Sequence, residues 1–139
     1  MNSHHDEHVV PTGANAVHRV LLDVLALPEW NPAFHSVEGP ANAPVGTEYR
    51  IRVRPGLTGT LVYTHISTDR IDMTWQVPGF RETGSWTLRP RGTVTLVGHE
   101  FEHAGALATI LEPAYQNVAG LRLRRLEQRL RDEPAGYPR

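Results

Sequence analysis

The spacing of apolar residues divides the chain into a helical start, an extended middle and a helical end. Residues 14–25 predict an amphipathic helix, because apolar side chains recur there at helical intervals, at Val17, Val20, Leu21 and Val24. The apolar run before it, at residues 8–13, ends in Pro11 and Gly13 and predicts an opening strand and a turn. Prolines within residues 26–34 leave room for only a single helical turn there.

Apolar and polar residues alternate through the middle of the chain, from residue 46 to about residue 103. Residues 46–55 give the clearest strand, with Tyr49, Ile51 and Val53 on one side and charged residues on the other. The other predicted strands are residues 60–66, residues 70–77, the two halves of residues 84–101 with a tight turn at residues 89–92, and a short strand that begins at His35. This pattern indicates an antiparallel meander.

Helical spacing returns from residue 106 to about residue 132. One apolar stripe consists of Leu107, Leu111, Ala114, Val118 and Leu121, and a second consists of Ala119, Leu123, Leu126 and Leu130. The change of face near Gly120 predicts a bend or a change of packing partner, and Pro113 predicts a separate turn at the start. The five arginines between residues 122 and 131 are predicted to form a solvated face.

Length and composition indicate one domain over residues 1–139, with flexible ends at residues 1–6 and 133–139. A formal charge of -1 provides no basic field for nucleic-acid binding. The absence of cysteine excludes disulfides, thiolate metal ligands and a thiol nucleophile. The sequence shows neither an export signal nor an apolar stretch long enough to span a membrane. We therefore expect a cytoplasmic protein without a nucleic-acid partner.

The order of the elements predicts an α+β fold. A curved antiparallel sheet with one apolar face needs a cover, and the only predicted element long enough to supply it is the C-terminal helix. Two short helices follow the first strand. A sheet wrapped around one helix leaves space between them, which is a natural pocket for a small molecule.

Two segments resemble the helix-grip proteins of the START and Bet v 1 kind, the SRPBCC superfamily, and within it the bacterial polyketide cyclase/dehydrase-like proteins. Residues 9–39, VVPTGANAVHRVLLDVLALPEWNPAFHSVEG, are similar to the opening strand, helix, Trp-Asn-Pro turn and second strand of that family. Residues 85–105, SWTLRPRGTVTLVGHEFEHAG, are similar to its last hairpin. The resemblance implies a helix-grip fold over nearly the whole chain and a cavity for a hydrophobic ligand.

Residues 99–103 read HEFEH and match the H-E-x-x-H pattern of zinc metalloproteases. On a helix the two histidines could share a metal, but on a strand they lie roughly 13 Å apart. That is too far for two ligands that each lie about 2.0–2.1 Å from one zinc ion. The β-branched residues before the motif predict a strand, and Ala106 and Thr109 replace the glycine and third histidine of the extended protease pattern. We therefore expect no zinc protease, no metal site and no cofactor.

The strand that carries this motif can turn either of two sets of side chains inward. If the alternation that starts at Val94 continues, the two glutamates of the motif face the cavity. A β-bulge at Gly98 would instead turn His99, Phe101 and His103 inward. Burial of two unpaired carboxylates costs several kcal/mol, so we favour the bulge, or a strand end that is wet on both sides.

Strand parity and the helix-grip arrangement predict which side chains bind the ligand. The candidates on the concave face are Tyr49, Met73, Trp75, Trp86 and Leu88. Tyr63, His65 and Phe101 lie on strands for which either side could face inward. The others are Phe80, between two strands at the edge of the pocket, and Tyr115 and Asn117 on the long helix. If Tyr63 and His65 face inward, they form a polar pair able to orient a phenol or carbonyl or to move a proton near neutral pH. His99 is the third candidate for a catalytic role.

We expect the cavity to bind a small hydrophobic molecule such as a polyketide, an aromatic metabolite or a lipid. The protein would act as a carrier, or as a cofactor-free cyclase or dehydratase that uses acid/base chemistry. The alternative is a protein-interaction module without a ligand cavity, like the co-chaperone branch of the family. A cavity of a few hundred Å³ would favour the first, and a filled core with an exposed apolar patch the second. A homodimer is left open.

Overall fold

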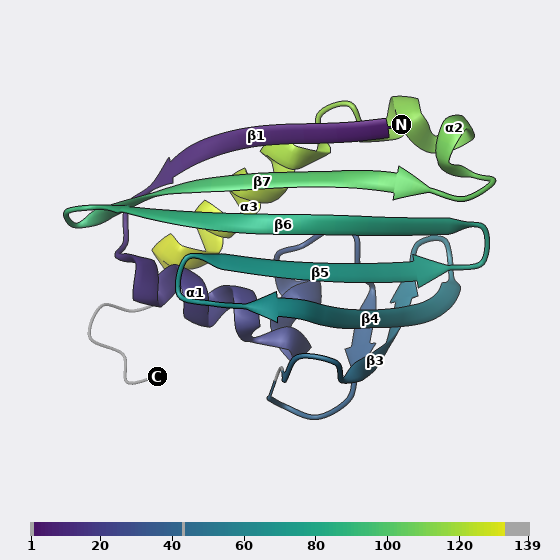
Figure 1. Cartoon of the computed structure of the whole chain (residues 1–139), viewed down its shortest axis with the longest axis horizontal. Helices are drawn as coiled ribbons and strands as arrows, with labels where there is room; N and C mark the ends of the chain where they lie inside the picture. Colours follow the sequence, from purple (N-terminus) through teal and green to yellow (C-terminus); the bar gives the residue numbers. More distant parts are fainter. Residues whose placement is uncertain (1, 43, 133–139) are drawn as a thin grey trace.

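The computed structural model describes residues 2–42 and 44–132, and its seven strands form one curved antiparallel sheet with the helices against one face (Figure 1). The strands are β1 (Asn2–Val10), β2 (Ser36–Glu38), β3 (Glu48–Val53), β4 (Leu57–Ile66), β5 (Arg70–Val77), β6 (Phe80–Arg91) and β7 (Val94–Ala104). The helices are α1 (Ala14–Leu22), η1 (Val24–Glu29), α2 (Ala108–Leu111), η2 (Glu112–Tyr115) and α3 (Val118–Asp132). The strand order β1-β7-β6-β5-β4-β3-β2 is a meander closed by β1, and the predicted α+β helix-grip fold is confirmed.

Strands β3 and β5 follow the sequence pattern of the first half of the chain, whereas the first helices depart from it. Side chains of β3 alternate between exposed and buried, and β5 covers the predicted residues 70–77. The first helix ends at Leu22 rather than at residue 25, because the backbone leaves the helical region at Asp23 with φ -78° and ψ 76°. A short 3₁₀ helix follows, but it spans Val24–Glu29 and contains Pro28, so it begins before the single turn expected between Pro28 and Pro32.

Strand β1 is longer than the sequence suggests. Residues 2–6, which we expected to be flexible, continue β1 and pair with β7. Side chains of β1 also reach the C-terminal helices: His4 Nε2 lies 2.8 Å from Glu112 Oε1, and His8 Nε2 forms a hydrogen bond with Glu127 Oε1. The expectation for residues 133–139 falls outside the described part of the chain.

The C-terminal segment is split into α2, η2 and α3, as Pro113 predicts. Helix α3 packs against β1 and β7, and it contacts α1 beside them (Figure 1). It buries the second predicted stripe, which consists of Ala119, Leu123, Leu126 and Leu130. Arg122 is buried with this stripe, so the prediction of a fully solvated arginine face is wrong for that residue. No helix in the described ranges is long and apolar enough to cross a membrane.

Strand β7 has no bulge. Its register with both β1 and β6 is unbroken through Gly98. The inward side chains are Thr95, Val97, His99, Phe101 and His103. The two histidines therefore face inward, as we favoured, but no bulge is needed. The regular alternation of β7 turns Thr95 inward rather than Val94, and every second residue after Thr95 follows it. Thr95 is a polar residue that the interior tolerates because its hydroxyl donates a hydrogen bond of 2.7 Å to the carbonyl of Thr12.

Candidate functional site

A buried ion pair joins the sheet to the C-terminal helix. Glu82 projects inward from β6 and Arg122 projects from α3, and their side chains are 3 % and 1 % exposed. Arg122 Nη1 donates to Glu82 Oε2 at 2.7 Å, and Nη2 donates to Glu82 Oε1 at 3.0 Å. This is the bidentate geometry in which a guanidinium matches a carboxylate best.

Two histidines of β7 complete this cluster, which we call the Glu82 centre: Glu82, His99, His103 and Arg122. His103 donates from Nε2 to Glu82 Oε1 at 2.9 Å. His99 contacts the carbonyl of Ser85 through Nδ1 at 3.0 Å and receives a hydrogen bond of 3.3 Å from Arg122 through Nε2. Because carboxylate and carbonyl oxygens only accept and a guanidinium only donates, the partners fix opposite tautomers: His103 carries its proton on Nε2 and His99 on Nδ1.

Burial and the neighbouring groups determine the protonation states of Glu82 and His99. Burial alone would raise the pKa of Glu82, but the charge of Arg122 and the hydrogen bonds from His103 and Arg122 outweigh burial and lower the pKa to about 2. Burial first, and the charge of Arg122 second, lower the pKa of His99 to about 3. At neutral pH the centre therefore contains one carboxylate, one guanidinium and a neutral His99.

One acceptor in the centre has no partner. Nδ1 of His103 is buried and makes no hydrogen bond, and the same is true of the Nε donor of Arg122. An unpaired buried polar atom costs about 1–3 kcal/mol, so each such atom needs a physical explanation. Among residues 2–42 and 44–132, no three metal-ligating side chains are grouped to hold a metal ion.

Aromatic rings enclose the Glu82 centre. The guanidinium of Arg122 lies 4.6 Å from the centre of the Phe101 ring, and His99 stacks on Trp86 with ring centres 3.7 Å apart. Phe80 and Tyr115 pack on His103, with ring centres 4.5 Å and 4.3 Å from its imidazole. These rings exclude water from the charged groups and strengthen their interactions.

The outer side of Phe80 and Tyr115 borders a mostly apolar recess of about 140 Å³. It lies between the ends of β3–β6 and the segment from α2 to η2. Its lining consists of Pro32, Ala33, Val53, Arg54, Leu57, Trp75, Val77, Phe80, Leu107, Leu111 and Tyr115. Burial first, and the charge of Glu82 second, raise the pKa of Tyr115 to about 12, so its phenol stays protonated and can donate a hydrogen bond.

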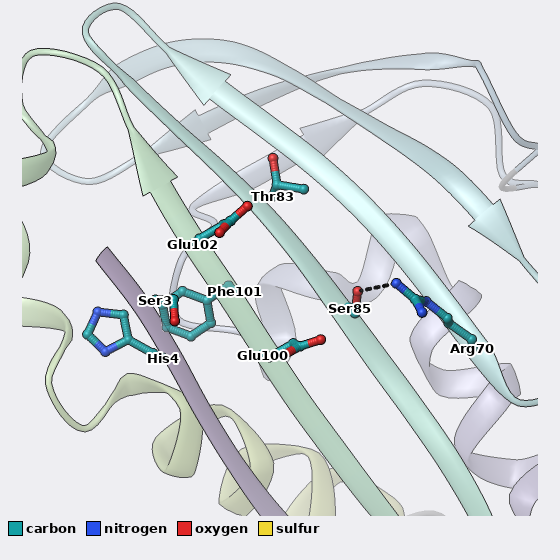
Figure 2. A pocket seen from close by; sticks show the side chains of 8 residues that line it. All are labelled: Ser3, His4, Arg70, Thr83, Ser85, Glu100, Phe101 and Glu102. Carbon is teal, nitrogen blue, oxygen red and sulfur yellow. Dashed lines mark hydrogen bonds between the residues drawn. The ribbon is translucent and has the colours of Figure 1, made fainter. Parts of the chain in front are cut away.

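A second hollow of about 270 Å³ lies on the outer face of the sheet and is mainly polar (Figure 2). Glu100 and Glu102 of β7 stand on this face, and Arg70 donates to the Ser85 hydroxyl at 3.4 Å. The glutamates of the HEFEH motif are thus solvated, whereas its histidines belong to the Glu82 centre.

The predicted ligand-binding residues divide into three groups. Tyr49, Tyr63, Met73, Trp75, Phe80, Trp86, Leu88 and Phe101 are buried, Tyr115 is half-buried, and His65 and Asn117 are exposed. Trp75, Phe80 and Tyr115 meet at the recess. Asn117 instead lies beside a surface hollow between β1 and the start of α3.

The predicted polar pair of Tyr63 and His65 does not form. A register shift between these residues in β4 turns His65 outward, where it contacts the Ser67 hydroxyl at 3.2 Å. Tyr63 remains inside and donates to the carbonyl of Leu21 at 2.7 Å. Of the three catalytic candidates, His99 has both nitrogens engaged, Tyr63 is a core residue and His65 is on the opposite face of the sheet.

The sequence interpretation missed Glu82 and Arg122 as members of a site. Each nevertheless had a signal. Glu82 shares the strand parity of Trp86 and Leu88 and is the only charged side chain on that face of β6 in the run 82–88. Arg122 falls between Ala119 and Leu126 at the helical spacing of the buried stripe.

The sheet, the covering helix and the recess at one end define a helix-grip protein, and solved structures share this fold. A START superfamily protein from Mycobacterium smegmatis is 15% identical with a TM-score of 0.77, over 93% of this chain and 97% of that one. A protein from Mesorhizobium loti is 16% identical with a TM-score of 0.77, over 95% and 99%. Norcoclaurine synthase from Thalictrum flavum, solved with dopamine and hydroxybenzaldehyde, is 14% identical with a TM-score of 0.71, over 96% and 88%.

The model of one sequence family matches residues 1–131, and the chain belongs to this family, described as polyketide cyclase / dehydrase and lipid transport. The resemblance stated from the sequence is thereby confirmed. The sequence matches no curated protein.

The opposite tautomers of the two buried histidines can be tested directly. Long-range ¹H–¹⁵N NMR spectra at neutral pH should show a protonated Nδ1 on His99 and a protonated Nε2 on His103, because Ser85 and Glu82 accept from those atoms. The exposed His65 provides the reference for a histidine without a buried partner. The same tautomer on both buried histidines would contradict the geometry.

Acid should destabilise the protein through His99. Below pH 6.5 the unfolded chain binds a proton at this residue, whereas the folded protein does so only near pH 3, so folding loses about 1.4 kcal/mol per pH unit between these values. Glu82 adds to the loss as the pH falls from 4.5 to about 2, because its pKa is lowered by folding.

The measurement is the free energy of unfolding in urea at several pH values. Subtraction of a His99→Phe profile from the wild-type profile should give the His99 slope between pH 6.5 and pH 4. His65→Gln is the matched control and should leave the profile unchanged. Parallel wild-type and His99→Phe profiles would show that His99 titrates normally in the folded state.

Proposed function

We propose that the protein binds a small, largely apolar molecule in the recess bordered by Phe80 and Tyr115. The observation that carries this proposal is the chemistry of the lining: Arg54 is its one charged side chain, and the others are apolar or aromatic. A small concave surface with few polar groups is typical of a ligand site.

The volume of the recess limits the size of the ligand. It holds about 140 Å³, close to the roughly 150 Å³ of an engineered apolar cavity that binds benzene. The ligand is therefore one ring, or one end of a longer molecule whose remainder stays outside. Packed side chains such as Trp86, Leu123 and Leu126 occupy the space along α3 where we expected the ligand cavity, and the recess is smaller than the few hundred Å³ expected.

The rim of the recess suits an entrance for apolar molecules. Leu57 borders the recess and is 39% exposed, and the helix α2 that carries the lining residue Leu111 also carries Ile110, which is 72% exposed. A filled core with exposed apolar side chains is the arrangement expected of the alternative, a protein-interaction module, so these side chains alone do not separate the two functions. The concave, mainly apolar lining of the recess is what favours a ligand over that alternative.

The comparisons support a ligand of this size. The family description includes lipid transport as well as polyketide cyclisation and dehydration, and a structural neighbour was solved with the single-ring molecules dopamine and hydroxybenzaldehyde. These similarities favour an aromatic metabolite or the end of a polyketide or lipid as the ligand.

A titration with toluene tests this proposal. Toluene should cause saturable NMR shifts at the Trp75 indole, since Trp75 lines the recess. Ala33→Phe fills the recess and should weaken binding about tenfold or more, which corresponds to about 1.4 kcal/mol. Thr93→Phe places the same side chain at the exposed hairpin turn at the other end of β6 and should leave binding unchanged. Shifts that stay the same in Ala33→Phe would place toluene elsewhere and contradict the proposal.

A further inference from the structure

We propose that the ligand carries a hydroxyl group that donates a hydrogen bond to Nδ1 of His103, so that the site selects single-ring aromatic alcohols of the phenol class. This inference rests on the proposed function, because the recess must first hold the ring.

The first step of the argument is the state of His103. Its Nε2 proton is committed to Glu82, and Arg122 holds Glu82 in place through two further hydrogen bonds. Nδ1 is therefore a lone-pair acceptor in a fixed orientation, buried and without a partner. A carboxylate that orients an imidazole and leaves its other nitrogen free is the arrangement by which proteins present histidine to a ligand.

The second step is the position of His103 relative to the recess. Phe80 and Tyr115 line the recess and also pack on the imidazole of His103, so this histidine lies directly behind the recess wall. The two rings stack on each other with centres 5.6 Å apart. Tyr115 belongs to the four-residue helix η2 and is half-buried, and the proposal requires a change of its rotamer to bring a ligand in the recess to Nδ1.

The third step is the chemistry of the group that Nδ1 accepts. A lone pair repels carboxylates and carbonyl oxygens and requires a donor. An ammonium donor would lose its hydration in the apolar recess, and the charge of Glu82 that could compensate for this loss is already neutralised by Arg122. A neutral hydroxyl meets both conditions.

Phenol and toluene form a matched pair of probes, because they have the same ring and nearly the same size. A purely apolar recess would favour toluene, since phenol must give up hydrogen bonds to water. An acceptor at Nδ1 reverses this order, and we expect phenol to bind about two- to tenfold more tightly than toluene, as one net hydrogen bond allows. Phenol should also shift the ¹⁵N resonance of His103 Nδ1, and toluene should not.

His103→Gln tests the acceptor itself. The amide of glutamine can still donate to Glu82 from the position of Nε2, but it leaves no acceptor at the position of Nδ1. The ratio of the two dissociation constants should fall to about one or reverse in this variant and stay as in the wild type in His65→Gln.

The outcomes separate the two proposals. Toluene binding that equals or exceeds phenol binding, or a phenol preference that survives in His103→Gln, overturns the role of His103 and leaves the recess as a ligand site. Failure of both probes to bind overturns the proposed function together with this inference. In the wild type, phenol binding without a shift at Nδ1 also rejects the proposed contact.

Discussion

A bidentate ion pair between Glu82 and Arg122 ties the middle of the sheet to the C-terminal helix at a place that water does not reach. Each charge alone would be costly to bury, and burial of the two together is tolerated because the guanidinium satisfies both carboxylate oxygens. The pair therefore joins α3 to β6, in addition to the packing of the helix against β1 and β7. It also explains why an arginine interrupts an apolar stripe of the helix.

The same pair prepares the candidate site. Because Arg122 keeps Glu82 ionised, Glu82 can hold the Nε2 proton of His103 and leave Nδ1 free. Burial, together with the charge of Arg122, which also donates to His99, keeps His99 neutral. The aromatic rings of Phe80 and Tyr115 then stand between this polar interior and the apolar recess. One cluster of side chains thus serves both the stability of the fold and the binding that we propose.

The fold was predictable because it depends on local patterns, whereas the site depends on contacts between distant residues. Alternation located β3 and β5, and helical spacing located the stripe buried by α3. Local patterns could not reveal that Glu82 meets Arg122 forty positions later, nor that the register shift in β4 turns His65 outward. The alternation of β7 was counted from Val94 rather than from Thr95, because a polar residue was not expected at an inward position.

The coupling between Glu82 and Arg122 is the most direct test of this account, and a double-mutant cycle of unfolding free energies measures it. Glu82→Gln and Arg122→Met should each cost about 3–5 kcal/mol, because each leaves a buried partner unpaired. The double variant should lose less than the sum of the two by about 2 kcal/mol or more, since it leaves no buried charge behind. Losses that add within about 0.5 kcal/mol would contradict the claim that this pair joins the helix to the sheet.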